Sequence, residues 1–300
     1  MERRFRGYFA SGSNHAGEIA GLAAIGCPVG VAVHEVNEAA LQELEKLAGT
    51  GIPVFVDSGA FGEFRNGKEI TDEEWRKRLG IYERLVRKLG RQTYCVAPDK
   101  VGDQEVTLAR LARYRWMVLK LRGLGANIIV PLQRGKLTMA EFAAEVELVL
   151  GFGDWVRGIP LMRAATKYEE LAAFAKTLKR GGTKVHFLGK GIYNPDFERY
   201  RNLVAHCELT CDSVRITALV GRKRGLGPLT AAQDRARVRY GYPAVPTRLK
   251  FEQTYRVKRD ALIEVLGPDL GNPALATRPR ELEAAMAAVP REPEQLLLVA

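Results

Sequence analysis

Three aspartates and a glutamine end or follow short apolar runs of the sequence: Asp57 in IPVFVDSGAF, Asp99 in TYCVAPD, Gln133 in NIIVPLQRG and Asp212 in TCDSV. Clustered carboxylates repel one another and are costly to remove from water, so a set of them at one place indicates function. Two carboxylates flanking a glycosidic carbon suffice for a retaining displacement, because one attacks the anomeric carbon while the other moves a proton. For any one aspartate alone, a helix N-cap or a turn is an equally good interpretation.

A third carboxylate beside a glutamine amide is able to recognise the edge of a purine. The carboxylate accepts from N1–H and N2–H and the amide donates to O6, a pattern that fits guanine rather than adenine. The glycines nearby allow the backbone to approach a flat base closely; they are Gly59, Gly158, Gly189 and Gly191. A barrel glycosidase that acts on sugars presents similar acids, so spacing alone leaves that alternative open.

Eight short apolar runs, rich in Val, Ile, Phe and Tyr, predict the buried parallel strands that would position these residues. They cover residues 4–10, 28–33, 52–57, 93–98, 127–132, 156–161, 184–189 and 211–216. Helical periodicity lies between them, and Thr138 with Glu141 and Thr166 with Glu169 have the spacing of capping boxes. The alternation predicts an α/β protein, a (β/α)8 TIM barrel. A doubly wound open sheet competes with it, but no GxGxxG follows the first strand.

The 300-residue chain is long enough for a barrel of about 250 residues with an appendage. We assign residues 1–225 to the catalytic barrel and residues 226–300 to a helical, basic C-terminal segment packed on it. Chemistry in such barrels takes place at the carboxyl ends of the strands, where the three aspartates and the glutamine fall.

The net charge of +11 is concentrated late in the chain. Between Arg215 and Arg259 there are twelve Lys and Arg but two acidic residues, with three tyrosines and a phenylalanine interleaved. A localised basic and aromatic surface is typical of a protein that binds a polyanion. A solvated basic face with no ligand usually mixes both signs, so the pattern favours nucleic acid as the partner.

The cysteines indicate small buried side chains rather than a disulfide framework or a metal site. His206, Cys207 and Cys211 offer three zinc ligands without a CxxC pair, so we expect no metal. No apolar run approaches about 18 residues, and the basic N-terminus lacks the apolar segment of a secretory signal. We therefore expect a cytoplasmic protein without a membrane partner.

The ordered motifs DSGAF, APD, LQRG, RGIP, HFLGKG and CDSVRI…GRKRG resemble those of the tRNA-guanine transglycosylase superfamily over about residues 5–225. The resemblance implies that Asp212 is the covalent nucleophile at the ribose anomeric carbon and that Asp57 is the general acid and base. The residues that it implies for binding the base are Asp99, Gln133, Gly158, Ser58 and Gly59. The residues that it implies for binding nucleic acid are Arg215, Arg222, Lys223 and Arg224.

Several positions depart from the family's motifs. Ala60 replaces the second glycine of DSGGF. Gly158 matches the first glycine of the family's Gly-Gly pair, but Ile159 replaces the second. Residues 216–218 read ITA in place of PTR. No cysteine follows Cys211, so the CxCxxC…His zinc module of the tRNA enzymes is absent. The chain is therefore most similar to the DpdA-type DNA 7-deazaguanine transglycosylases. That similarity implies exchange of guanine in DNA for preQ0 or a related base, with no required cofactor and in some cases with a partner ATPase.

The basic C-terminal surface argues against the glycosidase acting on sugars, and two further alternatives stay open beside this hypothesis. One is a transglycosylase acting on tRNA, of the queuosine or archaeosine type. The other is a non-catalytic nucleic-acid-binding homologue, against which the retention of Asp57, Asp99 and Asp212 argues. His34, which follows the second predicted strand, either lines the mouth of the barrel or has a structural role.

Overall fold

The computed structural model describes residues 7, 9–10, 14–24, 26–162, 165–190 and 196–212. Within this part of the chain one sheet contains seven strands, all in parallel pairs, in the order in which they occur in the sequence. The strands are β1 (Val29–Ala32), β2 (Val54–Asp57), β3 (Thr93–Val96), β4 (Asn127–Pro131), β5 (Val156–Pro160), β6 (Lys184–Leu188) and β7 (Glu208–Cys211). The predicted boundary at residues 225 and 226, and the basic segment after it, lie outside the described residues.

The N-terminal segment closes the sheet into a barrel. On one side, the Phe9 amide donates to the Cys211 carbonyl at 2.8 Å, and the Cys211 amide donates to the Gly7 carbonyl at 2.9 Å. On the other side, Ala10 forms a parallel bridge with Val29 in β1. Gly7, Phe9 and Ala10 therefore occupy the eighth strand position, between β7 and β1. The (β/α)8 prediction is confirmed for this part of the chain.

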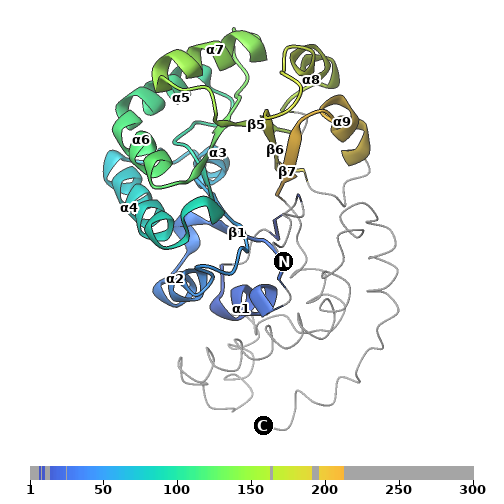
Figure 1. Ribbon diagram of the computed structural model, residues 1–300. Coiled ribbons are helices and arrows are strands. Elements are labelled where there is room, and N and C mark those ends of the chain that lie inside the picture. Colours follow the sequence, from blue (N-terminus) through green and yellow to red (C-terminus); the bar gives the residue numbers. More distant parts are fainter. Residues whose placement is uncertain are drawn as a thin grey trace, which may run out of the picture.

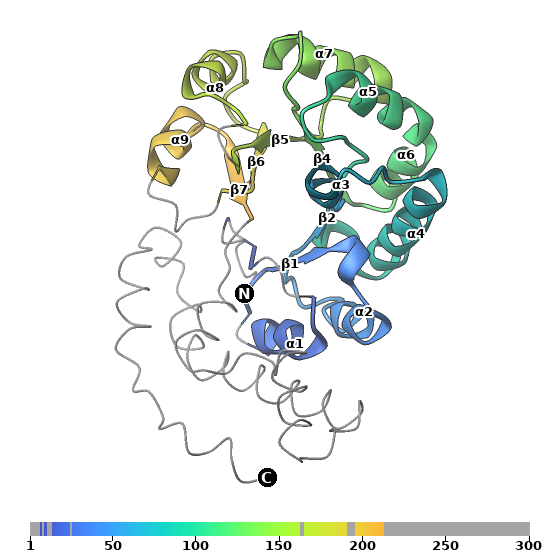
Figure 2. The ribbon, with the colours of Figure 1, turned by 180° about the vertical axis from the view of Figure 1, so that it is seen from behind.

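Helices cover the outside of the strand ring, except that α3, which directly follows β2, lies inward of the others in both views (Figures 1 and 2). They are α1 (Ala16–Ala24), α2 (Glu38–Glu45), α3 (Ala60–Asn66), α4 (Asp72–Leu89), α5 (Gln104–Arg113), α6 (Arg115–Gly123), α7 (Met139–Leu150), α8 (Tyr168–Ala175) and α9 (Phe197–Leu203). Two short 3-10 turns, η1 (Val33–Glu35) and η2 (Gly90–Gln92), follow β1 and precede β3. The loops that leave the carboxyl ends of β1 to β5 each lead to a helix.

Local signals explain where several helices begin. Thr138 accepts from the amide three residues later and forms the predicted capping box with Glu141, and Thr71 forms a capping box with Glu74 that was not predicted. Thr166 does not cap α8, because the helix begins one residue later, after Lys167, and the Lys167 amide donates to Glu170 at 3.1 Å. Thr166 is buried instead. The predicted cap at Thr166 is thus wrong by one residue.

The last strand also differs from its prediction. β7 ends at Cys211, whereas the apolar run CDSVRI predicts a strand over residues 211–216, of which 213–216 lie outside the described residues. The register with β6 explains the earlier start, because Lys184 pairs with Glu208 and Phe187 pairs with Cys211. Polar residues at 208 and 210 hid this strand from a search for apolar runs.

The barrel interior is a packed core. Phe9, Phe55, Val96, Ile129 and Val156 form a buried cluster inside the ring of strands. The imidazole of His186 stacks on the Phe55 ring at 4.8 Å and bonds to Thr210 Oγ1 at 2.7 Å. Burial lowers the pKa of His186 to about 3, so this imidazole is neutral. Because side chains fill the interior, chemistry is confined to the ends of the strands.

Candidate active site

Asp57 ends β2, and the chain turns sharply after it. Gly59 has a φ of +76°, in the left-handed region, and its amide donates to Asp57 Oδ2 at 3.2 Å. A Cβ at this position would lie 2.3 Å from Nδ1 of His34, so both conformation and space require glycine here. Burial raises the pKa of the Asp57 carboxyl, while the Gly59 amide and the nearby His34 lower it. A carboxyl that retains its proton at higher pH suits a general acid.

Ser58, Asp99 and Gln133 form one hydrogen-bonded set at the ends of three neighbouring strands. Ser58 Oγ donates to Asp99 Oδ1 at 2.9 Å, and Gln133 Nε2 donates to Asp99 Oδ2 at 2.8 Å. The amide of Gly102 donates to Gln133 Oε1 at 2.8 Å, which fixes which end of the Gln133 amide faces the aspartate. All three members of the set are buried. The sequence predicted Asp99 and Gln133 as separate contacts to a base, and the structure joins them to each other.

Burial dominates the electrostatics of Asp99. Burial and, to a lesser degree, the negative charge of Asp57 raise the pKa of this carboxyl to about 7. The hydrogen bonds from Ser58 and Gln133 and the charge of Arg110 act in the opposite direction. Asp57 ends β2 and Asp99 follows the neighbouring strand β3, and the residue after Asp57, Ser58, bonds to Asp99, so the two acids lie at the same end of the barrel. Asp99 therefore changes its charge near neutral pH.

Asp212 directly follows β7, so it lies at the carboxyl end of its strand rather than within it. Its Oδ1 accepts from the Gly189 amide at 2.6 Å, and its own amide donates to the Phe187 carbonyl at 3.3 Å. Gly189 has a φ of +76°, and a Cβ there would lie 2.8 Å from Cβ of Met162. The turn after β6 thus holds the Asp212 carboxyl by a main-chain amide.

Gly158 lies inside β5, where its carbonyl accepts from the Leu132 amide at 2.7 Å. A Cβ on Gly158 would lie 3.0 Å from side-chain atoms of Ile129 and Leu188 and from the Val130 carbonyl. Packing within the barrel wall therefore explains this glycine. Its predicted contact to a base stays a prediction.

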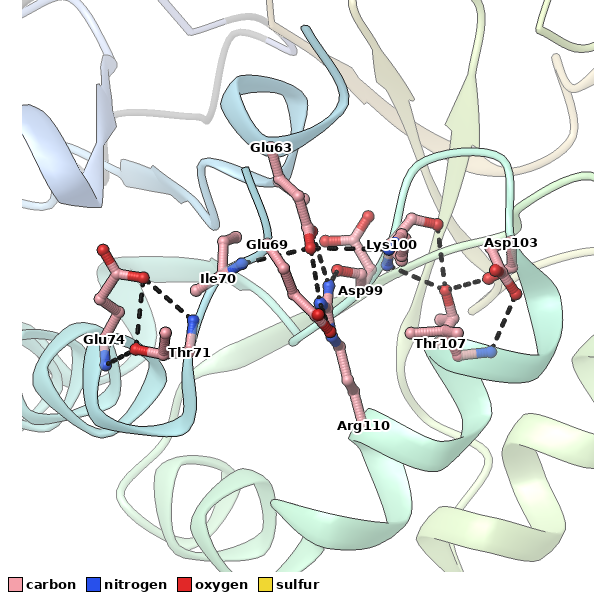
Figure 3. Close-up of polar contacts among 12 residues, drawn as sticks. Glu63, Glu69, Ile70, Thr71, Glu74, Asp99, Lys100, Asp103, Thr107 and Arg110 are labelled. Atoms are coloured by element: carbon pink, nitrogen blue, oxygen red, sulfur yellow. Dashed lines mark hydrogen bonds and ion pairs between the residues drawn. The ribbon is translucent and has the colours of Figure 1, made fainter. Parts of the chain in front are cut away.

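Sequence reasoning missed three buried residues behind the Ser58–Asp99–Gln133 set. Arg110 pairs with Glu63 in α3 and also donates to the main chain of Asp99 (Figure 3). Gln104, at the start of α5, donates to the main chain of Gln133. The signal was present in the sequence, because Gln104 and Arg110 fall on the helix face that packs inward, where a polar residue requires a partner.

The predicted nucleic-acid-binding residues lie outside the described residues; they are Arg215, Arg222, Lys223 and Arg224. Among the residues that the structure describes, no group of three or more His, Cys, Asp or Glu side chains is placed to hold a metal ion. In the same residues, no helix has both the length and the apolar character needed to cross a membrane.

Comparison with known proteins gives likenesses in structure alone. No protein-family model matches the chain, and no curated protein matches it in sequence. A xylose isomerase-like TIM barrel/4-hydroxyphenylpyruvate dioxygenase fusion protein is 11% identical, with a TM-score of 0.42 over 82% of this chain and 46% of its own. This chain thus spans about half the length of that protein.

Two further solved structures resemble the chain over most of their lengths. N-acetylneuraminate lyase of Proteus mirabilis is 12% identical, with a TM-score of 0.43 over 97% of this chain and 92% of its own. A dihydrodipicolinate synthase family protein of Coccidioides immitis is 11% identical, with a TM-score of 0.43 over 99% of this chain and 93% of its own. The assignment of the chain as a (β/α)8 barrel rests on its own strand pairing.

Proposed function

We propose that this chain is a pentosyltransferase that exchanges guanine in DNA for a 7-deazaguanine such as preQ0. The observation that carries the proposal is the buried Ser58–Asp99–Gln133 set beside Asp57 at the carboxyl ends of the strands. An acid poised near neutral pH and an amide held beside it are suited to reading the edge of a guanine.

The remaining hydrogen-bonding capacity of the set matches guanine. Each Asp99 oxygen uses one bond within the protein and retains a lone pair for N1–H or N2–H of the base. The Gln133 amide nitrogen carries two hydrogens and uses one on Asp99, which leaves one for O6. Adenine would present its own amino hydrogens to that donor, so the arrangement disfavours it.

The exchange follows from two displacements at one carbon. Asp212 attacks C1′ of the nucleotide, the bond from C1′ to the base nitrogen breaks, and an ester between Asp212 and C1′ forms. Asp57 delivers its proton to the departing guanine, which leaves as a neutral base. The incoming 7-deazaguanine gives its ring N–H proton to Asp57 and displaces Asp212 from C1′. One N-glycosidic bond replaces another, so no redox cofactor or ATP is consumed.

The target nucleotide has to leave the DNA stack to reach these acids. Flipping a base costs a few kcal/mol, which contacts between basic residues and phosphates help to offset. The basic residues from Arg215 onward are the proposed source of those contacts. The opposed placement of Asp57 and Asp212 across the bound nucleoside stays a prediction of the mechanism.

Removal of the proposed nucleophile tests the proposal. Asp212→Ala should abolish incorporation of labelled guanine or preQ0 into duplex DNA and abolish the covalent adduct seen on a denaturing gel, while DNA binding persists. Asp57→Asn should lower kcat more than it weakens DNA binding, because it removes a proton donor and leaves the contact surface. Asp154→Asn, which alters a mostly exposed acid paired with Arg122, is the matched control and should leave exchange unchanged.

The same assay separates the alternatives. Incorporation into tRNA and not into duplex DNA would assign the chain to the tRNA-modifying enzymes. Binding of nucleic acid with no exchange into either substrate, with and without an added partner ATPase, would assign it to the non-catalytic homologues. Full exchange by Asp212→Ala would overturn the mechanism.

A further inference from the structure

Helix α5 turns polar residues toward the strand ends. Gln104, Thr107 and Arg110 recur every three residues along it, and all three are buried. A core-facing helix position is normally apolar, and a polar group placed there is costly unless it is bonded. Thr107 Oγ1 accepts from the Lys100 amide at 3.0 Å, in the turn after Asp99. Each of the three side chains bonds to main chain at the end of β3 or β4 or in the turns that follow.

Arg110 fixes the main chain of Asp99. Its Nη1 and Nη2 each donate to Glu63 at 2.8 Å, which makes a buried two-bond ion pair. Nη1 also donates to the main-chain oxygen of Asp99 at 2.5 Å. Figure 3 shows this side chain reaching from α5 to both partners, and the Ile70 amide holds Glu63 in turn at 3.2 Å. Because a guanidinium is planar, the pair with Glu63 dictates the direction of the bond to Asp99.

Gln104 fixes the main chain of Gln133 in the same manner. Its Nε2 donates to the main-chain oxygens of Gln133 at 2.9 Å and Leu137 at 3.0 Å, and its Oε1 accepts from the Leu137 amide at 3.0 Å. A Cβ on Gly135 would lie 2.3 Å from this Oε1, so the loop passes directly over the Gln104 amide. The three bonds clamp the loop that begins at Gln133.

We propose that Gln104 and Arg110 are positioning residues, which hold the main chain of Gln133 and Asp99 so that the two side chains present a rigid face to the base. The inference rests on the proposed function, since it names what readies that site for guanine. Rigid placement lowers the ordering cost that binding otherwise incurs. A buried ion pair alone is weak evidence for stability, because desolvation offsets its attraction. The need to hold the main chain of Asp99 in place would explain why the Glu63–Arg110 pair is buried.

The chain contains a matched control for Arg110. Arg157 also donates to a glutamate, Glu147, at 2.9 Å and to a main-chain oxygen, that of Trp155, at 2.6 Å. It also lies over an aromatic ring, that of Trp155, as Arg110 lies over Trp75. Arg157 contacts neither Asp99 nor Gln133 in any of these bonds. Both arginines therefore contribute to structure, but of the two only Arg110 is proposed to position Asp99.

Gln104 has a matched control in Gln92. Nε2 of Gln92 donates to the main-chain oxygens of Leu47 at 3.0 Å and Ile52 at 2.8 Å, and Oε1 of Gln92 accepts from the Gly49 amide at 3.1 Å. The three bonds are of the same kinds as those of Gln104, on a loop that precedes β2 and carries no proposed site residue. Loss of either glutamine should loosen one loop.

Arg110→Met should raise the KM for the incoming 7-deazaguanine at least tenfold and raise the pKa of Asp99 above its wild-type value. Asp57 and Arg110 are the charged groups that act on this carboxyl, so loss of the cation leaves only the hydrogen bonds from Ser58 and Gln133 to oppose burial and the charge of Asp57. Arg110→Lys keeps the charge but loses the fork, so it should restore the pKa of Asp99 and leave KM raised. The paired variant E63Q/R110M avoids a lone buried carboxylate and should behave as Arg110→Met. The pKa is read by carbon NMR of the Asp99 carboxyl.

Gln104→Ala should raise the same KM about tenfold and increase the mobility of the Gln133 side-chain amide, measured as its nitrogen NMR order parameter. The control variants Arg157→Met and Gln92→Ala should lower the melting temperature. They should leave the KM, the pKa of Asp99 and the order parameter of Gln133 unchanged. If each site variant matches its control in all of these readouts, the positioning role is wrong. If the wild-type protein neither exchanges nor binds the base, the proposed function fails, while the NMR readouts still decide whether α5 holds the pair.

Discussion

Asp99 is subject to opposing influences from its surroundings. Burial and the charge of Asp57 favour its protonated form, whereas the donors Ser58 and Gln133 favour the carboxylate. With burial dominant, the protonated form prevails below a pH of about 7 and the carboxylate above it. Only the carboxylate accepts from both N1–H and N2–H of guanine, so recognition of the base should strengthen as pH rises through neutrality.

The same titration makes stability depend on pH. The folded pKa of Asp99 is about 7 against an ordinary value of 3.8, so between these values the native state holds a proton that the unfolded chain has lost. The free energy of unfolding therefore falls as pH rises through this window, by at most about 1.4 kcal/mol per pH unit from this residue. Asp99→Asn should flatten that fall in urea unfolding series between about pH 4 and 8. Asp154→Asn, at an exposed position, should retain it; an unchanged slope in Asp99→Asn would contradict the assignment.

At the scale of secondary structure, the sequence predicted most of the ring because buried strands are apolar and helix starts carry capping signals. β2 illustrates the first point and Thr138 the second, since both lie where their patterns indicate. β7 was placed too late because Glu208 and Thr210 interrupt its apolar character. The partnership of Asp99 with Gln133 could not be read from the sequence, because it depends on the register of two strands and on donors from α5.

The capping box of α7 gives a prediction at this scale. Thr138 Oγ1 accepts from the Glu141 amide at 3.3 Å and donates to the Glu141 carboxylate at 2.8 Å. Thr138→Ala should lower the free energy of unfolding by about 1 kcal/mol, because an N–H at the helix start loses its acceptor. Lys136→Ala changes a largely exposed residue in the same loop and should have little effect. Equal urea midpoints for the two variants would show that the cap contributes nothing.

For the whole molecule, the barrel depends on the N-terminal segment that completes its ring. Phe9 is fully buried at the barrel centre, with its ring 5.4 Å from Phe55 and 5.3 Å from Tyr94. Its amide also pairs with β7, one residue before Asp212. Phe9 therefore contributes both to the packed core and to the closure of the strand ring.

Phe9→Ala should lower the free energy of unfolding by about 3 to 5 kcal/mol, because it leaves a cavity where several strands face one another. Phe64→Ala removes a ring that is 56% exposed and should change stability by less than about 0.5 kcal/mol. Urea unfolding followed by circular dichroism compares the two. A small loss for Phe9→Ala would mean that the barrel closes without this ring.

Closure by the two ends of the barrel segment also bears on how the chain folds. The Phe9–Cys211 pairing joins residues almost as far apart as the described sequence allows, and contacts of such long range form slowly. Until β7 has been synthesised, the segment that contains Phe9 and strand β6 each have an unpaired edge. Such edges can pair with strands of other chains. Arrival of β7 covers both edges and delivers Asp212 in the same step. The strand that covers the last open edges of the barrel therefore also carries the proposed nucleophile directly after it.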